Sequence, residues 1–316
     1  MTRPTLDLNT RLGPLTLPNP VLTASGCSAA GRELAPFLDV AALGAVVTKS
    51  IQRAPRPGRP TPRMAETPSG MLNSIGLQGP GIEAFCAHDL PWLREAGARA
   101  VVSIAGGDAA EFAELAARLA GEPGVSAIEV NISCPNVANR GLVFACDPRS
   151  SSEVVTAVVE AVAGRLPVLA KLSPDVTDLS VIAGACLEAG ADGLSMINTT
   201  LGMVIDTDTL RPALAGITGG LSGPAIRPIA VRCVYQVFAA MRAGRIPAGP
   251  IVGIGGVLTG LDALQLVAAG AGAVQVGTAT FHDPSAPARV LSELADALAQ
   301  RGFDRFEEAI GRAHDS

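Results

Sequence analysis

The chain has 316 residues, of which 48% are apolar and 3% aromatic, and its net charge is −5. This composition argues against a disordered chain, and the absence of clustered basic residues argues against nucleic-acid binding. No run of 18 apolar residues predicts a membrane span, and we expect neither a signal peptide nor a membrane-bound helix at the N-terminus. The six cysteines are irregularly spaced, which favours a reduced, cytoplasmic protein with no metal site.

Short apolar runs alternate with longer helical patterns along the chain. Residues 1–19 contain the turn LGPL and predict a small hairpin at the bottom of the fold. Strands are predicted at 20–25, 45–50, 100–106, 127–133, 167–173, 193–198, 251–256 and 273–278. Helices are predicted at 31–42, 80–97, 108–121, 150–164, 177–190, 226–243, 260–269 and 285–301. Continuous apolar strands between helices indicate a parallel sheet, and eight repeats predict a TIM (β/α)8 barrel, with residues 1–316 as a single domain.

Two connections are longer than plain loops. They are residues 51–79, rich in Pro and Arg, and residues 199–225, which end in TGGLSGPA. Long ordered loops in a compact domain are usually functional. Both follow predicted strands, so we expect two active-site loops at the carboxyl end of the barrel.

Chemically useful residues collect at the predicted strand ends. Of the 24 basic residues only two are lysines, Lys49 and Lys171, and both lie there. The last two strands end in GIGG and VGT, where backbone N–H groups often hold a phosphate, although a tight turn explains these glycines equally well. Together these residues suggest a phosphorylated cofactor across the barrel mouth, and flavin mononucleotide (FMN) fits because a cation beside its ring stabilises the reduced anion.

Eight motifs spread over nearly the whole chain resemble one known family. They are VVTKS, MLNSIGLQGPG, NISCPN, KLSPDVTD, INTTLGMVID, GGLSGPAI, GIGG and AVQVGT. With them the chain resembles the dihydroorotate dehydrogenases, and the cysteine in NISCPN marks class I. The stretches ETPSGMLNSIGLQGPG and INTTLGMVID resemble the B-type, in which the catalytic chain works with a separate electron-transfer subunit.

The resemblance implies FMN-dependent oxidation of dihydroorotate to orotate in pyrimidine biosynthesis. Cys134 is implied as the general base that removes the C5 proton while hydride leaves C6 for flavin N5, and Lys49 lies between flavin and substrate. A free thiol has a pKa of about 8.5, so the base form should increase with pH. A buried, inert cysteine is the alternative. The role of Cys146, farther along the same loop, stays open.

The same resemblance assigns the binding residues. Orotate is expected to contact Lys49, Asn73, Ser74, Ile75, Gly76, Leu77, Asn131, Asn136, Asn198 and Thr199. FMN is expected to contact Ser25, Lys49, Ser50, Ser103, Asn131, Lys171, Ile197, Gly223, Gly255, Gly256, Gly277 and Thr278. Ser103 departs from the asparagine usual in the family. Alternatives are turn caps for the asparagines, an ion pair with Glu129 for Lys171, and a solvated or partner-facing loop for Arg53, Arg56, Arg59 and Arg63.

The electron acceptor is open at this point. If it is NAD, then FAD and an iron–sulfur cluster are expected on a partner subunit, around a homodimeric core within a heterotetramer. Alternatives are a fumarate-linked A-type homodimer, the catalytic chain of a dihydropyrimidine dehydrogenase, and a barrel that binds a phosphorylated ligand without redox chemistry. An A-type chain usually continues the cysteine motif with Pro-Gly-Lys-Pro-Gln, whereas this chain has VANRGLVFACDP.

Overall fold

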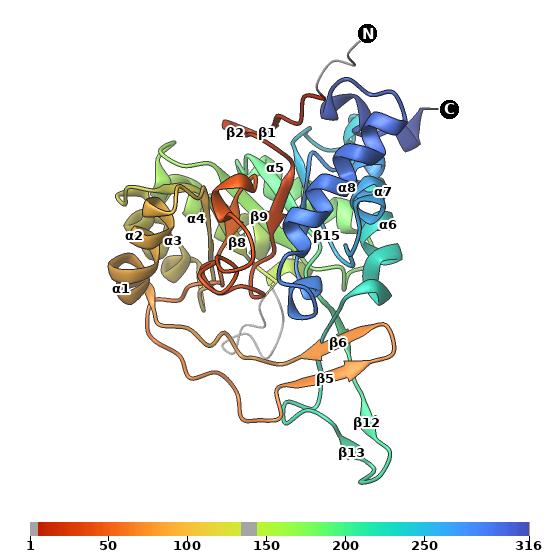
Figure 1. The fold of residues 1–316 in the computed structure, drawn as a ribbon. Coiled ribbons are helices and arrows are strands. Elements are labelled where there is room, and N and C mark those ends of the chain that lie inside the picture. Colours follow the sequence, from red (N-terminus) through yellow and green to blue (C-terminus); the bar gives the residue numbers. More distant parts are fainter. Residues whose placement is uncertain (1–5, 134–143, 316) are drawn as a thin grey trace.

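The computed structural model describes residues 6–133 and 144–315. Its central sheet has eight parallel strands in the order β3-β16-β15-β10-β9-β8-β7-β4. A bridge between Leu22 and Ala45 joins the two ends of this order, and the Thr23 N–H donates to the Ala45 carbonyl at 3.3 Å. The sheet thus closes into a barrel (Figure 1), which confirms the predicted TIM fold.

All eight predicted barrel strands are present. In chain order they are β3 (Val21–Thr23), β4 (Val46–Val47), β7 (Ala100–Ile104), β8 (Val125–Asn131), β9 (Val168–Leu172), β10 (Gly193–Met196), β15 (Ile251–Ile254) and β16 (Ala273–Val276). Their side chains are almost all buried, as expected for strands covered by helices outside and packed against each other inside.

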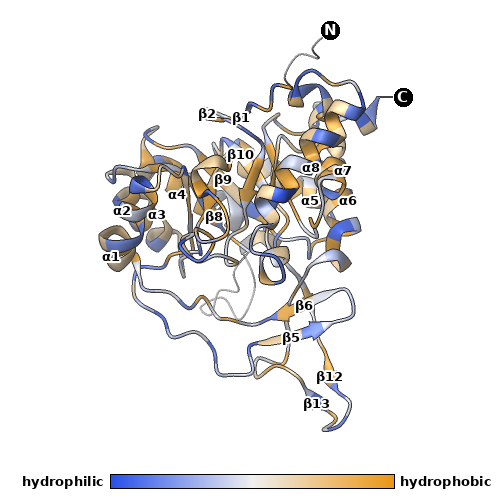
Figure 2. Cartoon of the chain, viewed as in Figure 1, coloured by the Kyte–Doolittle hydropathy of each residue, from blue (hydrophilic) through white to orange (hydrophobic). Residues whose placement is uncertain are grey.

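The helices pack outside the barrel. They are α1 (Ile82–Ala84), α2 (Leu90–Glu95), α3 (Ala109–Ala120), α4 (Pro148–Val162), α5 (Leu179–Glu188), α6 (Arg227–Arg242), α7 (Gly260–Ala269) and α8 (Ala286–Gln300). A π-helical turn, Phe85–Asp89, separates α1 from α2 within the predicted helix 80–97. Figure 2 shows hydrophobic and hydrophilic residues alternating around the helices, whose apolar faces pack on the strands.

The predicted helix at 31–42 is wrong. Residues 31–38 form a series of turns, and only Val40–Ala42 make a short 3-10 helix. Pro36 has no N–H to continue a helical hydrogen-bond ladder, and Gly31 has a φ of +91°. The apolar spacing that predicted a helix reflects burial instead, because Leu34 and Val40 reach the core from these turns.

The predicted N-terminal hairpin is confirmed. It consists of β1 (Thr10–Leu12) and β2 (Leu15–Leu17), paired antiparallel. Leu12 and Leu17 are fully buried and pack with barrel-interior residues such as Leu22, Val47 and Leu169. The hairpin therefore seals one end of the barrel with apolar side chains.

The two long loops pair with each other. Residues 51–79 supply β5 (Met64–Thr67) and β6 (Gly70–Asn73), and residues 199–225 supply β11 (Thr200–Gly202) and β14 (Gly219–Ser222). They form a four-stranded sheet in the order β11-β14-β6-β5. A small hairpin of β12 (Ile205–Asp206) and β13 (Arg211–Pro212) projects beyond it. We call the four-stranded sheet and this hairpin together the extension. The extension lies below the barrel in Figure 1, so the long loops form one ordered layer.

Among the described residues, no helix combines the length and the apolar character needed to cross a membrane.

Candidate active site

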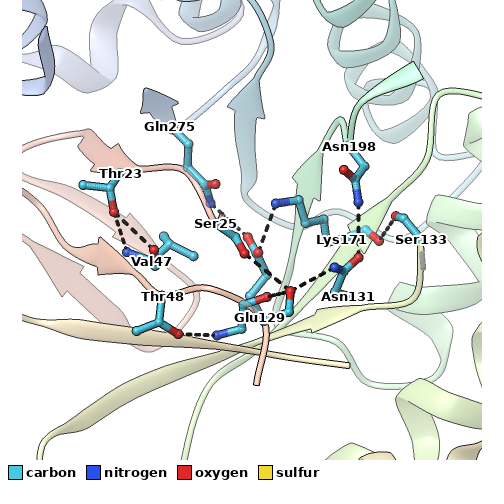
Figure 3. A network of polar contacts seen from close by, with 12 residues as sticks. Thr23, Ser25, Val47, Thr48, Glu129, Asn131, Ser133, Lys171, Asn198 and Gln275 are labelled. Carbon is cyan, nitrogen blue, oxygen red and sulfur yellow. Dashed lines mark hydrogen bonds and ion pairs between the residues drawn. The ribbon is translucent and has the colours of Figure 1, made fainter. Parts of the chain in front are cut away.

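A buried ion pair lies inside the barrel, beneath its carboxyl-end opening, the mouth. Lys171 on β9 places its Nζ 3.2 Å from Glu129 Oε1 on β8, and the two residues are 4% and 0% exposed. Gln275 on β16 donates from Nε2 to Glu129 Oε2 at 2.9 Å. The ion pair named as an alternative for Lys171 is thus present, and Figure 3 shows these side chains converging. Gln275 was missed because a glutamine inside an apolar strand has no distinctive sequence signal.

A chain of hydroxyl and amide groups lies at the strand ends. Asn131 Nδ2 donates to Ser50 Oγ at 3.0 Å, and Asn198 Nδ2 donates to Asn131 Oδ1 at 3.2 Å. Ser50 Oγ also lies 2.9 Å from Ser103 Oγ and 3.4 Å from Ser25 Oγ. These five predicted residues come from the ends of five different strands, and the barrel brings them together. Figure 3 labels Ser25, Asn131 and Asn198 among them. Ser103 is fully buried.

Both long loops reach the same region. Asn73, at the end of β6, donates to the Gly220 carbonyl at 3.3 Å. A Cβ on Gly220 would lie only 2.0 Å from Thr199 Oγ1, so this glycine allows β14 to pass close to the end of β10. The Thr199 N–H donates to Asn198 Oδ1 at 2.8 Å. Three of the four predicted substrate asparagines therefore belong to one contiguous set of contacts.

The predicted substrate contacts at residues 74–77 are held by an arginine from the earlier part of the same 51–79 loop. Arg59 Nη1 donates to Ser74 Oγ at 2.9 Å, and the Arg59 N–H donates to the Ile75 carbonyl at 3.0 Å. Gly76 packs on Arg59, and Leu77 has a φ of +56°. Arg59 was not assigned to the site from sequence, where it was one arginine among several.

The predicted glycines form a tight cradle at the ends of β15 and β16. A Cβ on Gly256 would lie 2.9 Å from the Gly223 carbonyl oxygen, and the Gly223 Cβ position lies 3.7 Å from a methyl of Thr278. Gly255 and Gly256 have φ values of +134° and +70°. Arg227 begins α6 beside this cradle and forms an ion pair with Asp262 at 2.6 Å. Arg227 was not predicted as a site residue from the sequence.

Ile197 and Gly277 complete the predicted cofactor set. Ile197 is buried directly after β10, and Gly277 follows β16. A Cβ on Gly277 would lie 3.2 Å from Cys27 Sγ and 3.0 Å from the Ala24 Cβ. A side chain at position 277 would therefore crowd these two strand ends.

Lys49 stands at the same mouth. A Cβ on Gly26 would lie 3.2 Å from Lys49 Nζ. Burial raises the pKa of Cys27 to about 11, and the ammonium groups of Lys171 and Lys49 act in the opposite direction. Both lysines are thus electrostatic neighbours of one thiol, which places their charges at one region of the mouth.

Cys134 and Asn136 lie outside the described residues. The described part of NISCPN is Asn131, Ile132 and Ser133, and Ser133 Oγ donates to the Lys171 carbonyl at 2.8 Å. Cys146 is an exposed free cysteine whose thiol lies 3.9 Å from the Asp175 carbonyl oxygen. Burial, followed by the charge of Asp175, raises the pKa of Cys146.

The described residues fit an FMN. The glycine cradle leaves no room for side chains where a phosphate would approach backbone, and the mouth offers ammonium, amide and hydroxyl groups for a polar ring edge. Two buried acceptors, Ser195 Oγ and Gln275 Oε1, also have no hydrogen-bond partner within the described part of the chain. No group of three metal-ligating side chains occurs in residues 6–133 and 144–315.

Comparisons with known proteins identify the family of the chain. The sequence model of the family described as dihydroorotate dehydrogenase matches residues 7–298. The chain is 49% identical to the dihydroorotate dehydrogenase B (NAD(+)) catalytic subunit of Geobacter sulfurreducens over 305 residues, covering 96% of this chain and 97% of the relative. The protein of the same name from Desulforudis audaxviator is 50% identical over 300 residues, covering 95% of each chain. The chain therefore belongs to the dihydroorotate dehydrogenase family of oxidoreductases.

Proposed function

We propose that this chain is the catalytic subunit of a B-type dihydroorotate dehydrogenase and acts as one FMN-binding domain. The observation that carries the proposal is the connected polar mouth, where Asn131, Asn198, Asn73 and Lys171 lie together at the strand ends. Planar amides can read both the donors and the acceptors of a pyrimidine ring. FMN supplies the hydride acceptor when it is bound.

The protein's own groups would share the remaining work. Cys134 takes the C5 proton of dihydroorotate, and the asparagines with residues 74–77 orient the ring. Lys49 would lie between substrate and flavin, where its positive charge would attract an anionic substrate. Lys171, Ser25, Ser50 and Ile197 hold the flavin side, with Ser103 behind Ser50. Gly223, Gly255, Gly256, Gly277 and Thr278 hold the phosphate end through their backbone.

The acceptor assignment rests on the relatives, which are named as NAD(+)-linked catalytic subunits. We propose that electrons pass to NAD through a partner subunit that carries FAD and an iron–sulfur cluster. We propose that the assembled enzyme is a homodimer within a heterotetramer. Exposed apolar side chains occur on the extension, and such residues mark a protein contact where they form one contiguous patch. They include Leu201, Leu210 and Ile217, which are 67%, 78% and 58% exposed.

One experiment tests this function. Purified protein, loaded with FMN, is assayed for dihydroorotate oxidation with fumarate, quinone and NAD, with and without the co-expressed partner subunit. We expect NAD reduction only with the partner present. Efficient fumarate reduction by the isolated chain would instead support the A-type enzyme, and a protein that takes up no FMN would refute the flavoenzyme.

The two loop cysteines offer a matched test of the general base. Cys134→Ser should bind orotate yet lose most turnover at neutral pH, because a serine hydroxyl, unlike a thiol, is almost never deprotonated to the base form near pH 7. Cys146→Ser should keep turnover within about twofold, since Cys146 is exposed and its thiol lies at 3.9 Å from the Asp175 backbone carbonyl, a weak contact that a serine hydroxyl can replace. Steady-state kinetics with an orotate-binding titration measures both. Near-normal turnover in Cys134→Ser would refute the base assignment.

A further inference from the structure

The floor of the mouth contains a carboxylate to which the proposed function assigns no role. Glu129 is fully buried and uses both carboxylate oxygens, one toward Lys171 at 3.2 Å and one toward Gln275 at 2.9 Å. β8 and β9 are neighbours, whereas Gln275 reaches Glu129 from β16, four places away in the strand order. The carboxylate is therefore clamped from two sides of the barrel.

Stability alone is a poor reason for this arrangement. Removing a carboxylate and an ammonium from water costs several kcal/mol per ion, and well-packed apolar residues in place of a buried pair are often as stable. The barrel interior next to the N-terminal hairpin is apolar, with Leu22, Val47, Leu169 and Val252 in one cluster. The charged pair lies at the mouth end instead, since Glu129 is two residues before Asn131 on β8 and faces the same side.

Lys171 is the group through which Glu129 can act. Asn131 and Lys171 are register partners on β8 and β9. The Lys171 side chain therefore starts beside Asn131, which bonds to Asn198 at the strand ends. A lone ammonium there would strongly favour the anionic, reduced form of a flavin. A carboxylate 3.2 Å away opposes that field and also fixes where the ammonium points.

We propose that Glu129, held by Gln275, is a positioning residue that orients Lys171 and counterbalances its charge, and thereby sets the reduction potential of bound FMN. This inference rests on the proposed function, because it requires FMN at the mouth. The amide of Gln275 serves the carboxylate by donating one hydrogen bond, while its own Oε1 has no partner among the described residues.

The Glu129→Gln variant isolates the charge. The new amide oxygen can still accept from Lys171, and its NH2 can donate to Gln275 if the Gln275 amide turns its partnerless oxygen inward. Shape and hydrogen bonds are kept while one negative charge is lost. Glu114→Gln is the matched control, because Glu114 lies on the surface of α3 and is 58% exposed, where salt screens its charge.

The measurement is the two-electron midpoint potential of FMN in the purified holoprotein, by equilibration with reference dyes, together with the FMN dissociation constant. In Glu129→Gln the reduced-to-oxidised FMN ratio at a fixed applied potential should rise at least tenfold. This corresponds to a midpoint potential higher by about 30 mV for a two-electron couple. Glu114→Gln should leave it unchanged. An unchanged potential in a Glu129→Gln protein that binds FMN overturns the inference.

The double variant Glu129→Gln/Lys171→Met separates action through Lys171 from direct action. In the double variant both charges are gone. Its reduced-to-oxidised FMN ratio at the same applied potential should therefore fall back from the Glu129→Gln value to within tenfold of the wild-type value. A potential that stays high in the double variant shows that Glu129 does not act through Lys171. If Glu129→Gln does not fold, the double variant alone decides. A reduced-to-oxidised FMN ratio more than tenfold below wild type would then mean that the charge of Lys171 acts on the flavin without a counterbalancing charge, which overturns the inference. A wild-type protein that takes up no FMN refutes the proposed function itself.

Discussion

The arginines of the 51–79 loop have different partners. Arg53 forms an exposed ion pair with Glu114 at 3.3 Å, whereas Arg59 and Arg63 contact residues 74–78 of their own loop. Arg63 donates to Gln78 Oε1 at 2.7 Å and to the Pro57 carbonyl at 3.0 Å. Arg59 reaches Ser74, directly after the predicted substrate contact Asn73. Neither a solvated loop nor a partner-facing loop alone therefore describes these residues.

Replacing Arg59 should weaken substrate binding more than turnover. Arg59→Ala removes a charged hydrogen bond to Ser74 Oγ, and such bonds contribute about 1.5–3 kcal/mol when they are well buried. This one is partly buried, so we expect KM for dihydroorotate to rise about tenfold while kcat changes less than about threefold. Steady-state kinetics measures both values.

Arg53→Ala is the control for Arg59→Ala. It removes an arginine from the same loop, but its exposed ion pair with Glu114 contributes little. KM should stay within about twofold of wild type. Equal effects of the two variants would contradict a positioning role for Arg59.

At the scale of elements, the sequence pattern predicts the barrel well because each strand and helix carries its own periodicity. The eight apolar runs and seven of the eight helices are where that pattern places them, and the exception contains Pro36. The pairing of β6 with β14 was not predicted. Leu72 lies opposite Leu221 in that pair, and nothing local in either segment specifies a partner so far along the chain.

The site was predictable to a similar degree. Asn131 and Asn198 lie together at the strand ends, as the predicted fold requires, and their substrate role stays a prediction. Gln275 and Arg59 were missed because their roles depend on side chains from distant elements. Cys134 and Asn136 remain predictions, since they lie outside the described residues.

Helix α5 begins with a titratable cap. Asp178 accepts from the Ser180 N–H at 2.9 Å and from the Ser180 hydroxyl at 2.6 Å, and these bonds lower the pKa of Asp178. A carboxylate with a lowered pKa in the folded state stabilises the fold above its unfolded pKa, about 3.8. That contribution is lost as the pH falls through the folded value.

Asp178→Ala should therefore cost about 1 kcal/mol of unfolding free energy at pH 7, and the difference from wild type should shrink below about pH 4. Urea unfolding at several pH values measures it. Asp178→Asn keeps an acceptor without a titrating group, so its advantage over Asp178→Ala should not vary with pH. A wild-type advantage over Asp178→Ala that persists undiminished below pH 4 would contradict the cap.

At the scale of the whole molecule, the two ends of the barrel have different chemistry. The mouth end contains Glu129, Lys171 and Gln275 in its interior and is covered by the extension (Figure 1). The opposite end is filled by Leu12 and Leu17 of the hairpin. In barrels of this kind the carboxyl end of the strands carries activity, and the other end carries stability.

Leu12→Ala tests this division. Leu12 is fully buried, and such a truncation leaves a cavity that costs about 2–5 kcal/mol. We expect a loss of about 3 kcal/mol in unfolding free energy by denaturant titration. Turnover per folded molecule should be unchanged, because the cavity opens at the end of the barrel away from the mouth. Leu15→Ala makes the same chemical change at a partly buried position of the hairpin and should cost clearly less. If a fully folded Leu12→Ala protein turned over more slowly than wild type, the two ends of the barrel would be coupled. Activity and stability would then not be divided between them.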